Sequence, residues 1–161
     1  VKENAMNVSQ SILSLNAFSK TNQVGTDAAF FRVEKIDLSL INNKLVSEQP
    51  EKWTPELIER SEYLYRRFLV LHAIYPQEDL VPTTLIDEYW HQHILDTKKY
   101  ASDCEFLFGQ FLHHDPYFGI NGEADRQRNK QAFSWTKSLW QSTFGEPLLG
   151  EANPCKATDC R

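Results

Sequence analysis

The chain has 161 residues, of which 41% are hydrophobic and 24% are charged, and its formal net charge is −5 at pH 7. This length suits one domain, the composition is too apolar for a disordered chain, and the negative charge argues against a general nucleic-acid-binding surface. Nowhere does the sequence contain the run of about 18 apolar residues that a membrane-spanning helix needs. We therefore expect a globular protein that binds neither nucleic acid nor a membrane.

The three cysteines do not form the even framework of a small disulfide-rich secreted protein. Cys104 lies within a patterned segment, whereas Cys155 and Cys160 lie in a polar tail. The first residues lack the long apolar stretch and small-residue cleavage site of a signal peptide. A cytoplasmic location is the prediction.

Residues 1–28 are polar and are expected to form an N-terminal arm or a peripheral helix. Apolar residues then recur from Phe30 to Val46, mostly at spacings of three or four, which predicts a helix. Thr54 is a good N-cap, and Pro55 suits the first position of a second helix. That helix is expected to continue to about residue 73, because Pro76 cannot extend it.

A third predicted helix begins at Thr84, and Asp96 resembles a fresh N-cap at which the chain bends into another helix ending at Gly109. The last predicted helix covers residues 124–143. No convincing strand pattern occurs, so the predicted class is all-α, a single-domain bundle of about five or six helices. The bundle is assigned to residues 29–145 and a C-terminal tail to residues 146–161.

The segment IDEYWHQHILD raises the question of a metal site. Residues two apart on a helix point about 200° from each other, so His91 and His93 cannot both bind one ion from a regular helix. Asp87 and His91 lie four apart and share a face. His93 would be free to turn inward if the helix ended near Leu95.

Three protein ligands with an open position form a common catalytic metal site, and two histidines with one carboxylate suit zinc or iron. Asp87 and His91 are the predicted core ligands. His93, or His113 or His114 from the sequence FLHHDPYFG, would complete the set. The alternative is that these histidines belong to a hydrogen-bonded core or are solvated in a turn. Asp87 would then be present only because a negative charge is favourable near a helix N-terminus.

Tyr100 and Cys104 lie four apart and share a helix face. The functional interpretation makes Tyr100 a proton donor and Cys104 a thiol near the metal. The structural interpretation makes both residues part of a core stripe with Leu107, because a free cysteine commonly behaves as a small hydrophobe. His72, near a helix end, is expected to interact with the helix dipole instead of a metal.

The run VPTTLIDEYWHQHILDTKKYASDCEFLFGQFLHH resembles the glycine-rich domain-containing protein-like family, which occurs in plants, fungi and bacteria. The residues that carry the resemblance are Asp87, Trp90, His91, His93, Tyr100, Asp103, Cys104, Phe108 and Gly109. They span about a quarter of the chain, which lacks the glycine-rich region of the larger members. The resemblance implies a helical domain built around the Trp-His-x-His segment and supplies no reaction.

Two functions are compatible with these observations. The first is a small helical metalloprotein that uses iron, copper or zinc as a metal-dependent enzyme, oxidising or hydrolysing a peptide or small molecule. The second is a protein-interaction module in which Trp90, Trp135 and Trp140 build a core or groove and the polar motif locks it. Convergence of the imidazoles on one point beside a cavity would favour the first. Separate partners for each imidazole would favour the second.

Overall fold

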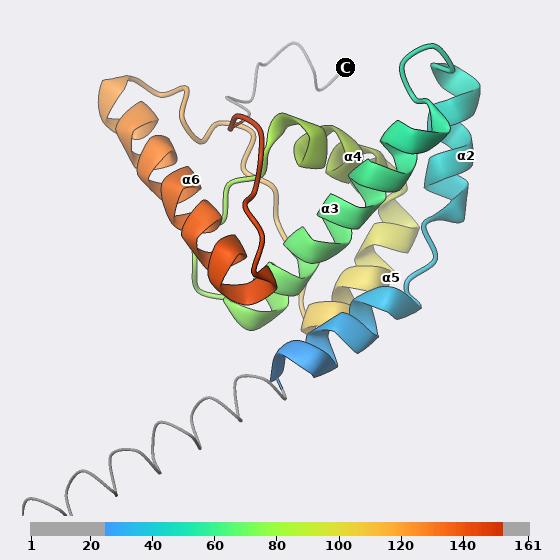
Figure 1. The fold of residues 1–161 in the computed structure, drawn as a ribbon, viewed down its shortest axis with the longest axis horizontal. Helices are drawn as coiled ribbons and strands as arrows, with labels where there is room; N and C mark the ends of the chain where they lie inside the picture. Colours follow the sequence, from blue (N-terminus) through green and yellow to red (C-terminus); the bar gives the residue numbers. More distant parts are fainter. Residues whose placement is uncertain (1–24, 153–161) are drawn as a thin grey trace, which may run out of the picture.

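The computed structural model describes residues 25–152, which form helices joined by loops (Figure 1). The helices cover residues 25–35, α2 (Ser39–Glu48), α3 (Pro55–Ile74), α4 (Thr84–Leu95), α5 (Thr97–Phe108) and α6 (Glu123–Phe144). In this part of the chain, the only β-type pairing is an isolated bridge between Thr83 and Ala152. The all-α prediction is confirmed.

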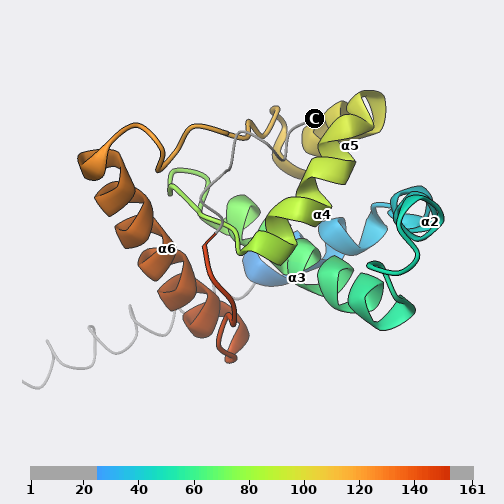
Figure 2. The same ribbon diagram turned by 90° about the horizontal axis from the view of Figure 1, so that it is seen from above.

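The long helix α3 lies at the centre of the fold, with α6 on one side of it and α2 and α5 on the other (Figures 1 and 2). Helix α4 crosses α3 and contacts both α3 and α5. A single hydrophobic core joins these helices, and its largest fully buried side chains include Tyr65, Phe68, Tyr89, Tyr100 and Trp140.

Local capping residues set the predicted helix boundaries around the site. Thr54 accepts a hydrogen bond from the Leu57 N–H ahead of Pro55, and Asp96 accepts one from the Lys99 N–H at the start of α5. Helix α5 ends at Gly109, whose φ of 67° favours glycine because a side chain is strained there. The predicted bend at Asp96 is therefore confirmed.

The single helix predicted over residues 30–46 is instead two helices separated at residues 36–38. Asp37 accepts a hydrogen bond of 2.9 Å from the Ser39 N–H, which favours a new helix start. Arg66, from α3, donates to the carbonyl oxygens of Val33 and Ile36 at 2.6 and 3.2 Å. This distant arginine satisfies carbonyls at the end of the first helix, so the apolar spacing alone could not reveal the break.

The predicted boundary between the arm (1–28) and the bundle (29–145) lies inside the first helix, because residues 25–35 are all helical. After α6, residues 146–152 return to the start of α4, where Thr84 N–H donates to the Glu151 carbonyl at 3.1 Å. Leu148 of this returning segment is buried. The rest of the predicted arm, together with Cys155 and Cys160, lies outside the described residues. Within residues 25–152, no helix combines the length and apolar character needed to cross a membrane.

Candidate metal centre

Helix α4 presents Asp87 and His91 one turn apart on the same face, as their spacing predicts. Thr83 caps the helix by accepting a hydrogen bond from the Ile86 N–H. Asp87 therefore lies in the first turn, where the unpaired N–H groups of the helix favour a negative charge. Its carboxylate is only 2% exposed, yet one oxygen lies 3.4 Å from His91 Nε2.

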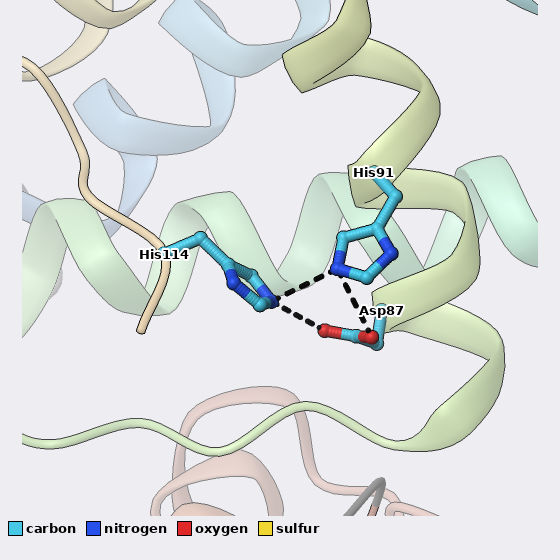
Figure 3. A group of neighbouring side chains, drawn as sticks. All are labelled: Asp87, His91 and His114. Carbon is cyan, nitrogen blue, oxygen red and sulfur yellow. Dashed lines mark hydrogen bonds and ion pairs between the residues drawn. The ribbon is translucent and has the colours of Figure 1, made fainter. Parts of the chain in front are cut away.

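His114 reaches the same point from the loop that follows α5 (Figure 3). Its Nε2 lies 2.8 Å from Asp87 Oδ1 and 3.1 Å from His91 Nε2. The three side chains thus form a triangle of potential ligand atoms. Among residues 25–152 this is the only group of three or more histidine, cysteine or carboxylate side chains that could hold one ion. We refer to Asp87, His91 and His114 as the triad.

With Asp87 ionised, protons on the two imidazoles cannot satisfy all three contacts of the triad, because a carboxylate only accepts hydrogen bonds and each Nε2 either donates or accepts. If both Nε2 atoms carry protons, each can donate to Asp87, but two donors then face each other at 3.1 Å. If only one Nε2 carries a proton, the lone pair of the other faces a carboxylate oxygen. As long as Asp87 is ionised, every protonation state of the two imidazoles therefore leaves one repulsive contact.

A cation at the centre of the triad removes that conflict, because all three atoms then present lone pairs to it. An ion with bonds of about 2.1 Å holds ligand atoms about 3.0–3.4 Å apart at bond angles between octahedral and tetrahedral. The two Nε2 atoms lie 3.1 Å apart, within this range. Asp87 approaches His114 through Oδ1 at 2.8 Å and His91 through Oδ2 at 3.4 Å, and one ligand atom from each of the three residues lies within 4.8 Å of the others. The geometry and the donor types therefore fit one divalent transition metal ion.

Trp90 and Tyr100 hold the loop that carries His114. Trp90 Nε1 donates to the Tyr100 hydroxyl at 2.9 Å, and this hydroxyl donates to the Leu112 carbonyl at 2.7 Å. The Trp90 ring also packs against the His114 ring, with centroids 4.7 Å apart. This chain of contacts joins the loop to α4 just before His114.

The structure thus places Tyr100 in the core and outside the triad. Its side chain is 1% exposed, and burial raises the pKa of its hydroxyl well above the usual value. Burial likewise raises the pKa of the Cys104 thiol, which is also in the core. The hydroxyl takes part in two structural hydrogen bonds, so Tyr100 positions the loop, and its role as a proton donor stays a prediction.

Tyr100→Phe is expected to lower the free energy of unfolding by about 1–3 kcal/mol, because it leaves the buried Trp90 N–H and Leu112 carbonyl without their partner. Urea denaturation measures this difference. Tyr117→Phe is the matched control, because Tyr117 is exposed, and it should change stability by no more than about 0.5 kcal/mol. Equal stability of the two variants would contradict the positioning role.

Beyond His114, hydrogen bonds tie the loop to α6. Asp125 accepts from the N–H groups of Gly119 and Asn121 at 2.7 and 3.2 Å, and Asn129 donates to the Phe118 carbonyl at 3.2 Å. Gly119 has a φ of 98°, and a Cβ there would lie 3.0 Å from Asn129, so the close approach of loop and helix requires glycine. The loop is therefore fixed at both ends of the His114 segment.

His93 lies on the opposite side of α4, buried in the core. Its Nδ1 is 2.8 Å from the Tyr65 hydroxyl and its Nε2 is 2.9 Å from Asp103 Oδ2. A neutral imidazole satisfies both contacts, accepting from Tyr65 and donating to Asp103. Burial lowers the pKa of His93, which favours this neutral form. Helix α4 ends at Leu95, so His93 does turn inward, but its two partners are structural.

His113 is exposed and does not join the triad, although it precedes His114 directly. Its ring packs on Phe111, with centroids 4.9 Å apart. Of the five predicted ligands, the structure brings together Asp87, His91 and His114 and places His93 and His113 elsewhere.

Asp87, Trp90 and His114 line a cavity of about 270 Å³. His72 lines the same cavity, a position that no pattern in the sequence indicates. Its ring packs on Phe68 and Trp90, with centroid distances of 4.7 and 6.0 Å. Within the described residues, His72 Nε2 is buried without a hydrogen-bond partner, and burial lowers the pKa of His72 to about 4. Asp87 and His114 of the triad therefore border a space large enough for a small molecule.

Comparison with known families places this geometry in context. The sequence model of the UCP032817-like family matches residues 32–143, which is well over half of the chain and includes the whole triad. The chain belongs to the UCP032817-like family. The predicted membership in the glycine-rich domain-containing protein-like family is therefore wrong. The short Trp-His-x-His pattern that suggested it covers only a quarter of the chain, whereas this match covers nearly all described helices.

The UCP032817-like family is uncharacterised, so membership brings no activity with it. No curated protein and no solved structure matches the chain. The function must therefore be argued from the triad and its surroundings.

Proposed function

We propose that this protein binds one divalent transition metal ion through Asp87, His91 and His114 and acts as a metal-dependent enzyme on a small molecule or peptide. The observation that carries the proposal is the convergence of three ligand atoms, one from each residue, within 4.8 Å of one another at the edge of a cavity. Two of these atoms come from one face of α4 and the third from a loop that Trp90 and Tyr100 fix in place.

The donor set favours zinc, iron or copper, because imidazole suits all three and one carboxylate with two histidines is common for zinc and non-haem iron. Three protein ligands leave coordination positions for water or substrate. Such an ion would supply Lewis-acid or redox chemistry, compatible with hydrolysis or oxidation. Asp87 and His114 both line the cavity, so a ligand of the ion would occupy that space.

The cavity limits the size and charge of the substrate. Its volume of about 270 Å³ is at the lower end for small-molecule sites. Apart from the triad, its wall carries the carboxylates of Glu78, Asp79 and Asp115 and the guanidinium of Arg128. This excess of negative charge disfavours a strongly anionic group in the part of the substrate that enters here.

The alternative is a non-enzymatic interaction module, and the environment of His93 is the observation that favours it. Both ring nitrogens of His93 have protein partners, as a structural lock requires. The same description does not fit the triad with an ionised Asp87, where the protons on the imidazoles leave a repulsive contact. In the Trp-His-x-His motif, His93 is therefore a structural residue and His91 is a proposed metal ligand.

The metal content of protein purified without a histidine tag tests the proposal. Elemental mass spectrometry is expected to find close to one ion per chain in the wild type and almost none in His114→Ala. His113→Ala is the matched control, because it removes a neighbouring histidine outside the triad, and it should retain the metal. Circular dichroism would verify that all three proteins are folded.

Two outcomes would overturn the metal proposal. One is protein that neither carries metal nor takes up zinc, iron or copper after chelation and readdition. The other is equal metal binding by His114→Ala and the wild type. Activity assays with hydrolytic and oxidative substrate panels then test the enzymatic part, and the metal-free protein serves as the inactive reference.

A further inference from the structure

A second cavity, of about 200 Å³, shares the lining residues His72 and Leu112 with the cavity of the triad. Pro76 also lines both cavities. The remaining lining residues of the second cavity are Arg32, Ala73, Leu107, Phe108 and Gln110. No carboxylate belongs to this lining, in contrast to the first cavity.

Arg32 is the charged residue of the second cavity and comes from the helix of residues 25–35. Its Nε is buried and has no hydrogen-bond partner among residues 25–152. Within residues 25–152, Arg32 forms none of the ion pairs, whereas Arg66 and Arg67 pair with Glu62 and Glu146. A guanidinium remains charged at neutral pH, so a buried and unpaired donor on it is costly. An anion in the cavity would offset this cost.

His72 provides a second donor or acceptor on the same wall, because its buried Nε2 also lacks a partner in the part of the chain that the structure describes. In the neutral tautomer with a proton on Nε2, it donates one hydrogen bond. The Gln110 side chain, with its amide N–H groups, completes the polar part of the lining. The apolar part of the lining consists of Leu107, Phe108 and Leu112.

We infer that this second cavity binds a small carboxylate with an apolar body, whose anionic group pairs with Arg32 and accepts a hydrogen bond from His72. Arginine suits this role because its planar fork matches the two oxygens of a carboxylate. The apolar side chains would cover the body of the ligand. The site uses no residue of the triad, so it goes beyond the proposed metal function and does not depend on it.

Isothermal titration calorimetry with sodium benzoate tests this inference, with benzamide as the neutral analogue of the same shape. Both titrations use the full chain in the presence of EDTA, so that metal coordination cannot contribute. The wild type is expected to bind benzoate at least about tenfold more tightly than benzamide, as expected when a charge-assisted hydrogen bond replaces a neutral one.

Arg32→Gln is expected to weaken benzoate binding by at least about tenfold and to abolish the preference over benzamide. Arg60→Gln is the matched control, because Arg60 is exposed and lies outside the cavity, and it should bind like the wild type. His72→Phe, which removes the second donor, should weaken benzoate binding by several fold. His114→Ala should bind benzoate normally, which separates this site from the metal site.

The inference is overturned if the wild type binds benzoate no better than benzamide, a comparison that needs no folded variant. It is also overturned if folded Arg32→Gln retains wild-type affinity for benzoate. Loss of benzoate binding in His114→Ala but not in Arg32→Gln would place the anion at the triad and contradict it.

Discussion

His93→Ala is expected to destabilise the protein by about 3–5 kcal/mol, the range for a mutation that both opens a core cavity and breaks a buried hydrogen-bond network. His93 is 1% exposed and links Tyr65 of α3 to Asp103 of α5. Its removal leaves the Tyr65 hydroxyl and an Asp103 oxygen without their histidine partner. Lys99, 2.8 Å from the same oxygen, would still neutralise the carboxylate.

Urea denaturation at neutral pH in EDTA measures this loss without any contribution from metal. His113→Ala is the control for removing an imidazole from the surface, and it should change stability by no more than about 0.5 kcal/mol. A loss of less than about 1 kcal/mol in His93→Ala would show that the Tyr65–His93–Asp103 link is not a structural lock.

Acidification is expected to destabilise the wild type through His72. The unfolded chain protonates this histidine near its ordinary pKa of 6.5, whereas burial keeps it neutral in the folded chain down to a pKa of about 4. Protons therefore bind preferentially to the unfolded chain between these values. Stability is fully present above pH 6.5 and is lost as the pH falls towards 4, by about 3 kcal/mol in total.

His72→Phe removes this titration, so its free energy of unfolding should fall less steeply over the same pH range. Urea denaturation of both proteins in EDTA measures the two slopes, and other titrating groups contribute equally to both. The charged or titratable residues that share the two cavities with His72 are Arg32, Glu78, Asp79, Asp87, His113, His114, Asp115 and Arg128. Identical slopes would contradict a neutral, buried His72.

Helix boundaries with local causes could be predicted from the sequence. Thr54 with Pro55, and Asp96, act through hydrogen bonds or dihedral preferences within a few residues, so the sequence alone indicates them. The break at residues 36–38 could not be predicted in this way. It depends on Arg66, some thirty residues later in the chain, and an apolar spacing that continues across the break conceals it.

The same distinction applies to the triad. The shared face of Asp87 and His91 follows from helix geometry and was predicted correctly. The choice of His114 over His113 depends on how the Trp90–Tyr100–Leu112 contacts orient the loop, which no local pattern encodes. His72 and Arg32 belong to cavities formed by several helices, so their unpaired nitrogens become visible only in three dimensions.

The triad joins two points of the chain that are 23 residues apart, from His91 on α4 to His114 after α5. Helix α5 has its main helix contact with α4. A bound ion would therefore act as a reversible crosslink that closes a loop of chain from residue 91 to residue 114, and this loop contains α5. Such a closed loop reduces the conformational freedom of the unfolded chain. Gain or loss of the ion would therefore change the stability of α5 against local unfolding.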